Sequence, residues 1–145
     1  MSKQNVQYEG VTGHGVGIMS AEIELDHAMM TDSGSTTGTY DWTNPIPPYS
    51  LRLGCVVETL ETYSAACTVA VGITAAANEW TSATTGTCTT LGYKHVFPYG
   101  AATIITGQEN TAAESVHITL TVADWTLITT GRIKVKVFFL ATQVS

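Results

Sequence analysis

The side chains of this sequence that could take part in catalysis are few and far apart. The four histidines are His14, His27, His95 and His117. A Ser-His-Asp arrangement is recognised by its geometry rather than by chain order, but the Gly-x-Ser-x-Gly turn that presents such a serine in one large class of hydrolases is missing. A glycosidase needs two facing carboxylates, and the candidates are Glu58, Glu61, Glu79, Glu109, Glu114 and Asp124. Carboxylates on a β-sandwich surface are mostly solvated, so we expect no enzyme.

The three cysteines, Cys55, Cys67 and Cys88, are never closer than twelve residues. Zinc sites use pairs of Cys or His at short spacing, so we expect no metal and no cofactor. Cys55 and Cys67 are in phase with apolar neighbours and should face the core. Their strands either form a hairpin, with Cys55 opposite Gly72 and Cys67 opposite Leu60, or lie on opposing sheets. Sheets pack about 10 Å apart, beyond the roughly 7 Å limit for a disulfide, so buried free cysteines are expected.

Charge and hydropathy exclude several classes of partner. Only 12% of the 145 residues are charged, six are Lys or Arg, and the net charge is −6. A nucleic-acid partner would need a cluster of basic side chains. No apolar run approaches the ~18–20 residues that span a bilayer, and the first 17 residues lack the apolar stretch of a signal peptide. We therefore expect neither a nucleic-acid nor a membrane partner, and synthesis in a reducing cytoplasm.

Most of the chain alternates apolar and polar residues with the period of two that a half-buried strand requires. The clearest strands are expected at Met19–Met29, Tyr49–Leu60, Cys67–Ile73, Ser115–Val122 and Gly131–Leu140. Shorter ones are expected near Thr39–Thr43, Thr87–Thr90, Tyr93–Phe97 and Ala101–Thr106. About eight strands in one domain predict an all-β fold, an antiparallel jelly-roll-like β-sandwich. Residues 18–145 should form this single domain, and the glycine-punctuated residues 1–17 a loose N-terminal arm.

A jelly roll places its first and last strands side by side, and the charges offer a test of that arrangement. Glu22, Glu24 and Asp26 share the outer face of the first long strand, and Lys134 and Lys136 share that of the last. Opposite charges facing each other across an antiparallel pair contribute ~0.2–1 kcal/mol, so we predict that these strands are neighbours. Simple solvation of both faces explains the pattern equally well.

Two further features point to surfaces that contact other proteins. The outer face of the last strand changes from lysines to Phe138 and Leu140, as expected where a second layer covers a strand. That layer is either the N-terminal arm or a neighbouring subunit. Aromatic residues in or beside loops, Trp42 and Trp125 among them, either cap the sandwich, anchor subunit contacts or stack on sugars. The candidate contact residues are Tyr8, Val11, His14, Trp42, Trp125, Phe138 and Leu140.

Several segments resemble the small head-decoration (cement) proteins of tailed bacteriophages. They are Leu51–Thr59, Cys67–Ile73, Gly92–Ala101, Thr119–Trp125 and Thr130–Phe138. These strand-and-turn patterns fall within residues 50–140, and the first 50 residues do not match clearly.

The resemblance implies a β-sandwich or β-tulip protein without catalytic residues. Its implied location is the virion, on the outer capsid surface, after assembly in the host cytoplasm. The implied partners are the major capsid protein, whose neighbouring subunits it would clamp, and further copies of this chain in a homodimer or homotrimer, the dimer being favoured. The alternative is a carbohydrate-binding or receptor-binding β-sandwich domain of a tail fibre or spike.

Overall fold

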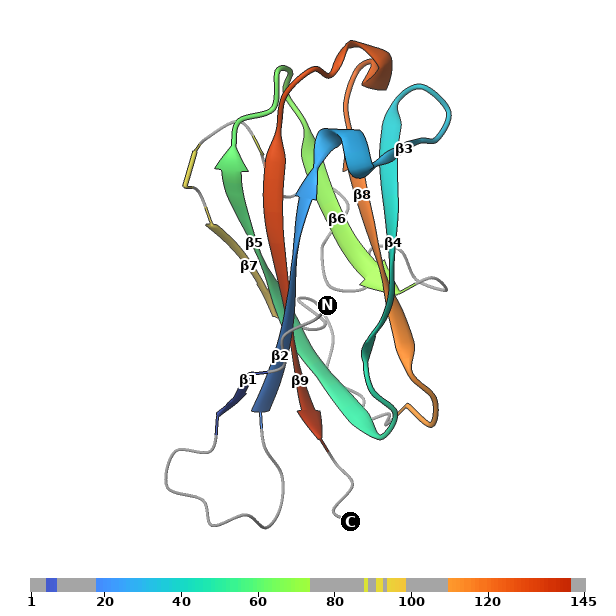
Figure 1. Cartoon of the computed structure of the whole chain (residues 1–145), viewed down its shortest axis with the longest axis vertical. Coiled ribbons are helices and arrows are strands. Elements are labelled where there is room, and N and C mark those ends of the chain that lie inside the picture. The colour runs from blue at the N-terminus through green and yellow to red at the C-terminus, as the bar shows by residue number, and fades with distance from the viewer. Residues whose placement is uncertain are drawn as a thin grey trace.

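The computed structural model describes residues 5–7, 18–73, 88, 91–92, 94–98 and 110–141 as two antiparallel sheets (Figure 1). The first sheet has the strand order β1-β2-β9-β5-β7 and the second the order β3-β4-β8-β6. The strands are β1 Asn5–Gln7, β2 Ile18–Asp26, β3 Thr31–Asp32, β4 Thr37–Ile46, β5 Ser50–Glu61, β6 Thr68–Ile73, β7 Lys94–Pro98, β8 Glu114–Thr121 and β9 Arg132–Ala141. Two 3-10 turns are η1 His27–Met29 and η2 Trp125–Leu127.

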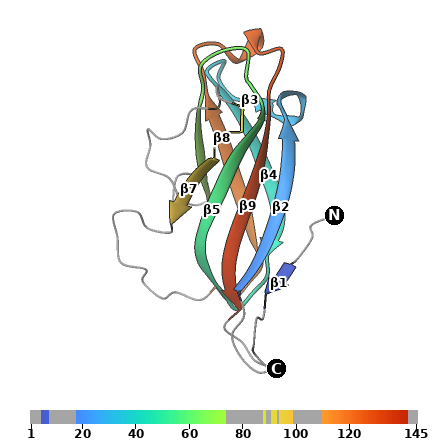
Figure 2. The same ribbon diagram turned by 90° about the vertical axis from the view of Figure 1, so that its left-hand side faces the viewer.

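The chain passes back and forth between the sheets in the interleaved order of a jelly roll. Strands β2, β5 and β9 belong to the first sheet, whereas β4, β6 and β8 belong to the second. Figure 2 shows the two layers, with β2, β9 and β5 in front of β4 and β8. The predicted all-β antiparallel sandwich is therefore confirmed.

The predicted pairing of the first and last long strands is also confirmed. In the β2–β9 register Glu22 is opposite Lys136, Glu24 is opposite Lys134, and Asp26 is opposite Arg132. The charged residues thus form cross-strand pairs on the outer face, where such pairs stabilise an antiparallel ladder.

The alternating inward residues of both sheets form one core. Its largest fully buried side chains come from β2, β4, β5, β6, β8 and β9 and include Leu25, Ile46, Val57, Val71, Ile118 and Phe139. Cys55 and Cys67 are both buried, on β5 in the first sheet and just before β6 in the second. The hairpin alternative for these two strands is therefore wrong, and the arrangement on opposing sheets is observed.

Strand β4 extends to Ile46, beyond the short strand expected near Thr39–Thr43. Its ladder with β8 is interrupted between Trp42 and Ile46, where Pro45 lies and where Asn44 has a φ of 49°. The Ser115 hydroxyl accepts a hydrogen bond from the Asn44 amide at 3.1 Å. Proline cannot donate to a ladder and is confined to edges and bulges, so the strand passes through Pro45 by forming a bulge.

Trp42 and Trp125 are core residues and not exposed loop aromatics. Trp42 lies within β4 and is 7% exposed, and Trp125 begins η2 and is 8% exposed. A Cβ built on Gly38 would lie 2.4 Å from the Trp125 ring, so the ring packs directly against the backbone of β4. Their placement as surface anchors is therefore corrected, and we leave both out of the contact surface proposed below.

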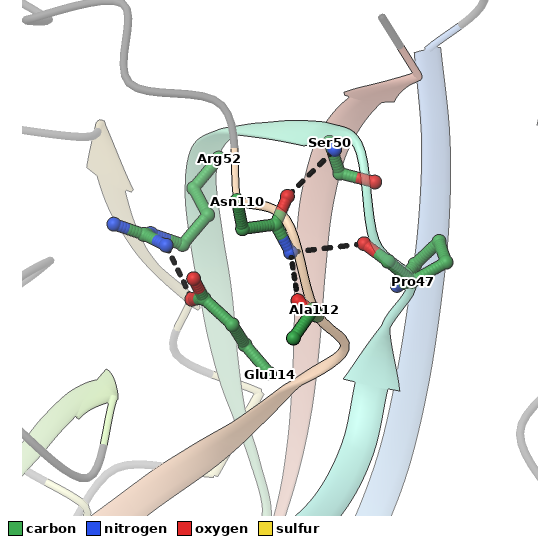
Figure 3. Close-up of polar contacts among 6 residues, drawn as sticks. All are labelled: Pro47, Ser50, Arg52, Asn110, Ala112 and Glu114. Carbon is green, nitrogen blue, oxygen red and sulfur yellow. Dashed lines mark hydrogen bonds and ion pairs between the residues drawn. The ribbon is translucent and has the colours of Figure 1, made fainter. Parts of the chain in front are cut away.

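The turn between β4 and β5 is tied to the start of β8 by Asn110, which is 8% exposed (Figure 3). Its side-chain carbonyl accepts from the Ser50 amide at 2.6 Å, and its amide donates to the carbonyls of Pro47 at 3.0 Å and Ala112 at 2.8 Å. Beside this cluster the Arg52 guanidinium is hydrogen bonded to the Glu114 carboxylate, which joins the two sheets. These contacts close one end of the sandwich.

Candidate protein-contact surface

The outer face of the first sheet carries a charged zone next to an apolar zone. Its side chains come from β2, β9 and β5, whose registers place three residues side by side in each row. One row is Glu24, Lys134 and Glu58, and the next is Glu22, Lys136 and Val56. A third row is Ser20, Phe138 and Gly54, and the last is Ile18, Leu140 and Leu51.

The charged zone surrounds a shallow hollow of about 180 Å³ lined by Glu22, Val56, Glu58, Lys134 and Lys136. The Lys134 Nζ lies 3.3 Å from the Glu58 Oε2, and both side chains are partly exposed. Partly exposed ion pairs of this kind contribute at most about 1 kcal/mol to stability. The main physical effect of the charged zone is to favour this register of β9 between β2 and β5.

The apolar zone, which we call the outer apolar patch, consists of Ile18, Leu51, Phe138 and Leu140. Ile18 is 50% exposed, and the other three are half-buried. Phe138 has the small residues Ser20 and Gly54 on either side, and Lys136 Nζ lies 5.5 Å from the centre of its ring, within cation–π range. The patch is a row of three aliphatic side chains beside an aromatic ring with a cation at its margin, which is typical of a protein-contact surface.

The predicted contact residues fall into three groups: some lie on the outward face, some are buried in the core, and some lie outside the described residues. Phe138 and Leu140 lie on the outward face, as predicted, and the structure adds Ile18 and Leu51 to them. Tyr8, Val11 and His14 lie outside the described residues. Of the predicted arm, Asn5–Gln7 form β1 beside Ser20, Met19 and Ile18, which extends the same sheet. Sequence reasoning missed Ile18 and Leu51 because only the register of β9 with both neighbours shows that they share a row with Leu140.

The outer face of the second sheet holds a His-Asp pair that resembles part of a catalytic triad. The His117 Nδ1 lies 2.5 Å from the Asp41 Oδ1; the His117 side chain is partly exposed and that of Asp41 is exposed. The nearby Ser115 hydroxyl donates to the Asn44 side-chain oxygen at 3.2 Å. The Ser115 hydroxyl is thus hydrogen bonded to the β4 bulge. The His117–Asp41 pair links β4 to β8 across the ladder.

Within the described ranges no group of three or more His, Cys, Asp or Glu side chains could hold a metal ion. No helix in the part of the chain that the structure describes has the length and apolar character needed to cross a membrane.

These features define an antiparallel jelly-roll sandwich with a mixed charged and apolar outer face. No family model matches the chain, and no curated protein matches it significantly. The fold is similar to that of a chain in the solved structure described as "Cyanophage Pam1 capsid asymmetric unit", with a TM-score of 0.56 and 19% identity. The similarity covers 94% of this chain and 92% of that chain. At this level of identity the likeness establishes the fold.

Proposed function

We propose that this chain is a virion structural protein of a tailed bacteriophage, a decoration or cement subunit that binds the outer capsid and stabilises contacts between major capsid subunits. The observation that carries the proposal is the jelly-roll fold shared, over nearly the whole of both chains, with a chain from a phage capsid asymmetric unit. The segment resemblances to cement proteins support the same class. In this proposal the chain has no catalytic role and works as a homo-oligomer, with the dimer favoured.

The surface chemistry supports a protein partner. With only 12% charged residues, the chain has fewer charges than usual to desolvate on binding, and charged residues are depleted at the centres of protein interfaces. The outer apolar patch would supply the buried centre of the contact, and the adjoining row of Glu22 and Lys136 its polar margin. Of the aromatic residues that the carbohydrate-binding alternative could use, Trp42 and Trp125 are buried and cannot stack on a sugar.

The test is co-sedimentation of the purified chain with empty shells assembled from the cognate major capsid protein. We expect saturable binding and a higher shell melting temperature. Leu140→Gln should weaken binding by about 10- to 100-fold, because burying a leucine side chain contributes roughly 1.5–3 kcal/mol. Leu127→Gln is the matched control, since Leu127 lies in η2, away from the outer apolar patch, and is 69% exposed. No binding to shells, with a monomer by light scattering, would overturn the proposal.

Equal loss of binding in both leucine variants would leave the capsid role intact and refute the outer apolar patch as the contact. Saturable binding on a glycan array, without shell binding, would support the carbohydrate-binding alternative instead.

A further inference from the structure

Two of the three cysteines meet at one end of the core, close to the start of β6. The Cys88 amide donates to the Cys67 carbonyl at 3.3 Å, and the Cys88 carbonyl accepts from the Tyr63 amide at 3.3 Å. Cys67 is 3% exposed and Cys88 is fully buried. The main chains of Cys67 and Cys88 are therefore held together by a ladder-like hydrogen bond.

This backbone contact gives the two residues a separation that a disulfide can span. The Cys67–Cys88 contact is a single backbone hydrogen bond outside the strand ladders. Such a bond holds two Cα atoms at roughly the spacing of an antiparallel pair, about 5.5 Å, within the range of roughly 4.4–6.8 Å found for disulfides. The Cys67 and Cys88 side chains are also close enough to influence each other's pKa. Cys55 differs in that it is buried on β5 in the other sheet, where it is opposite Val137 and Phe97.

The interaction between the two side chains also makes the two thiols unequal. Donation by the Cys88 thiol lowers the pKa of Cys67, and the same contact raises the pKa of Cys88. Burial raises the pKa of the Cys55 thiol. Since the thiolate is the reactive form, Cys67 is the nucleophile of the pair, Cys88 the resolving thiol, and Cys55 inert.

We propose that Cys67 and Cys88 are an oxidisable pair that forms an intramolecular disulfide when the protein meets a small hydroperoxide. The Cys67 thiolate attacks one oxygen of hydrogen peroxide, which gives a sulfenic acid at Cys67 and releases hydroxide. The Cys88 sulfur then attacks the sulfenic sulfur, loses its proton and forms the S–S bond, and water is released. In sum two thiols and one hydrogen peroxide give one disulfide and two waters. Peroxide is small enough to reach thiols through slight local opening.

This inference goes beyond the proposed function, and the reaction does not depend on that function. If the chain is a virion protein, the thiols stay reduced in the cytoplasm and oxidise after release of the particle. The bond would link Cys67 to residue 88 and close a loop between them. A closed loop reduces the freedom of the unfolded chain, so oxidation would make the protein harder to unfold outside the cell.

The experiment treats the full-length reduced chain with hydrogen peroxide and then digests it without reductant for mass spectrometry. We expect a linked peptide containing Cys67 and Cys88, with Cys55 still available for alkylation after denaturation. The melting temperature of the oxidised chain should rise by about 5–10 °C, and reductant should reverse the rise. Because this comparison uses one unchanged sequence, it does not depend on the folding of a variant.

Single cysteine variants identify which two residues form the disulfide. Cys67→Ser and Cys88→Ser should each abolish the linked peptide and the rise in melting temperature, whereas Cys55→Ser, the control at a buried cysteine, should retain both. The proposal is overturned if the folded wild-type chain gives no linked peptide, if Cys67 proceeds to a sulfinic acid without linking, or if Cys55 pairs in place of Cys88. None of these results bears on capsid binding, which the shell experiment tests separately.

Discussion

Asn110 gives the most direct test of what holds together the end of the sandwich where β4 turns into β5 (Figure 3). Asn110→Ala removes three side-chain hydrogen bonds, one accepted from the Ser50 amide and two donated to the carbonyls of Pro47 and Ala112. Each bond contributes about 1 kcal/mol net. The Ser50 amide belongs to a buried residue and would also lose a partner, at a further cost of about 1–3 kcal/mol. The expected loss in the free energy of unfolding is therefore about 4–6 kcal/mol.

Urea unfolding followed by tryptophan fluorescence measures this loss. With a slope of about 2 kcal/mol per molar, the midpoint should fall by roughly 2–3 M. Asn44→Ala is the matched control, because its exposed side chain accepts a single bond from Ser115 and its φ is 49°. It should cost only about 1–2 kcal/mol. If Asn110→Ala costs no more than Asn44→Ala, the polar cluster does not hold this end and the reasoning is refuted.

Two further predictions concern the core. Gly131→Ala would place a Cβ 2.3 Å from the Tyr63 ring at a φ of 140°, so thermal denaturation should show a loss of about 2–4 kcal/mol. The control Gly92→Ala, with open space and a φ of 73°, should cost about 1 kcal/mol. Burial raises the pKa of the Cys55 thiol above its usual value of 9.0, so the folded chain keeps a proton that the unfolded chain releases. Stability is therefore full below about pH 9 and falls above it by up to about 1.4 kcal/mol per pH unit. Cys55→Ala should reduce that slope, and an unchanged slope in urea titrations at pH 9 to 11 would contradict this assignment.

The long strands were predictable because their physical cause is local. Alternation in β2, β8 and β9 puts one face of each strand in the core, and that requirement is written in the spacing of apolar residues alone. The pairing of β2 with β9 was also predictable, since opposite charges at matching positions favour one neighbour over others. The ends of the strands were less predictable, since β4 extends through Pro45 by means of a bulge.

Residues whose environment depends on distant segments could not be predicted. Trp42 and Trp125 lie near polar and small residues in the sequence, and their burial follows from the fold, for Trp125 from contact with Gly38. Likewise the meeting of Cys67 with Cys88 depends on the path of the chain between them. Asn110 appears as an ordinary polar residue before β8, and two of its three side-chain partners, Pro47 and Ser50, come from the distant turn between β4 and β5.

The charge rows on the outer face also determine where the outer apolar patch forms. If β2 slipped by two residues against β9, Glu24 would face Lys136 and Asp26 would face Lys134, so two charge pairs would survive. Glu22 would then face Phe138, and Ile18 would lose Leu140 as its neighbour. A carboxylate beside an aromatic ring lacks a counter-charge, and the aliphatic row would be broken. The native register instead satisfies three charge pairs and keeps Ile18, Leu140 and Leu51 in one row. The charges and the apolar row thus favour the same register, and that register turns scattered apolar residues into a continuous surface.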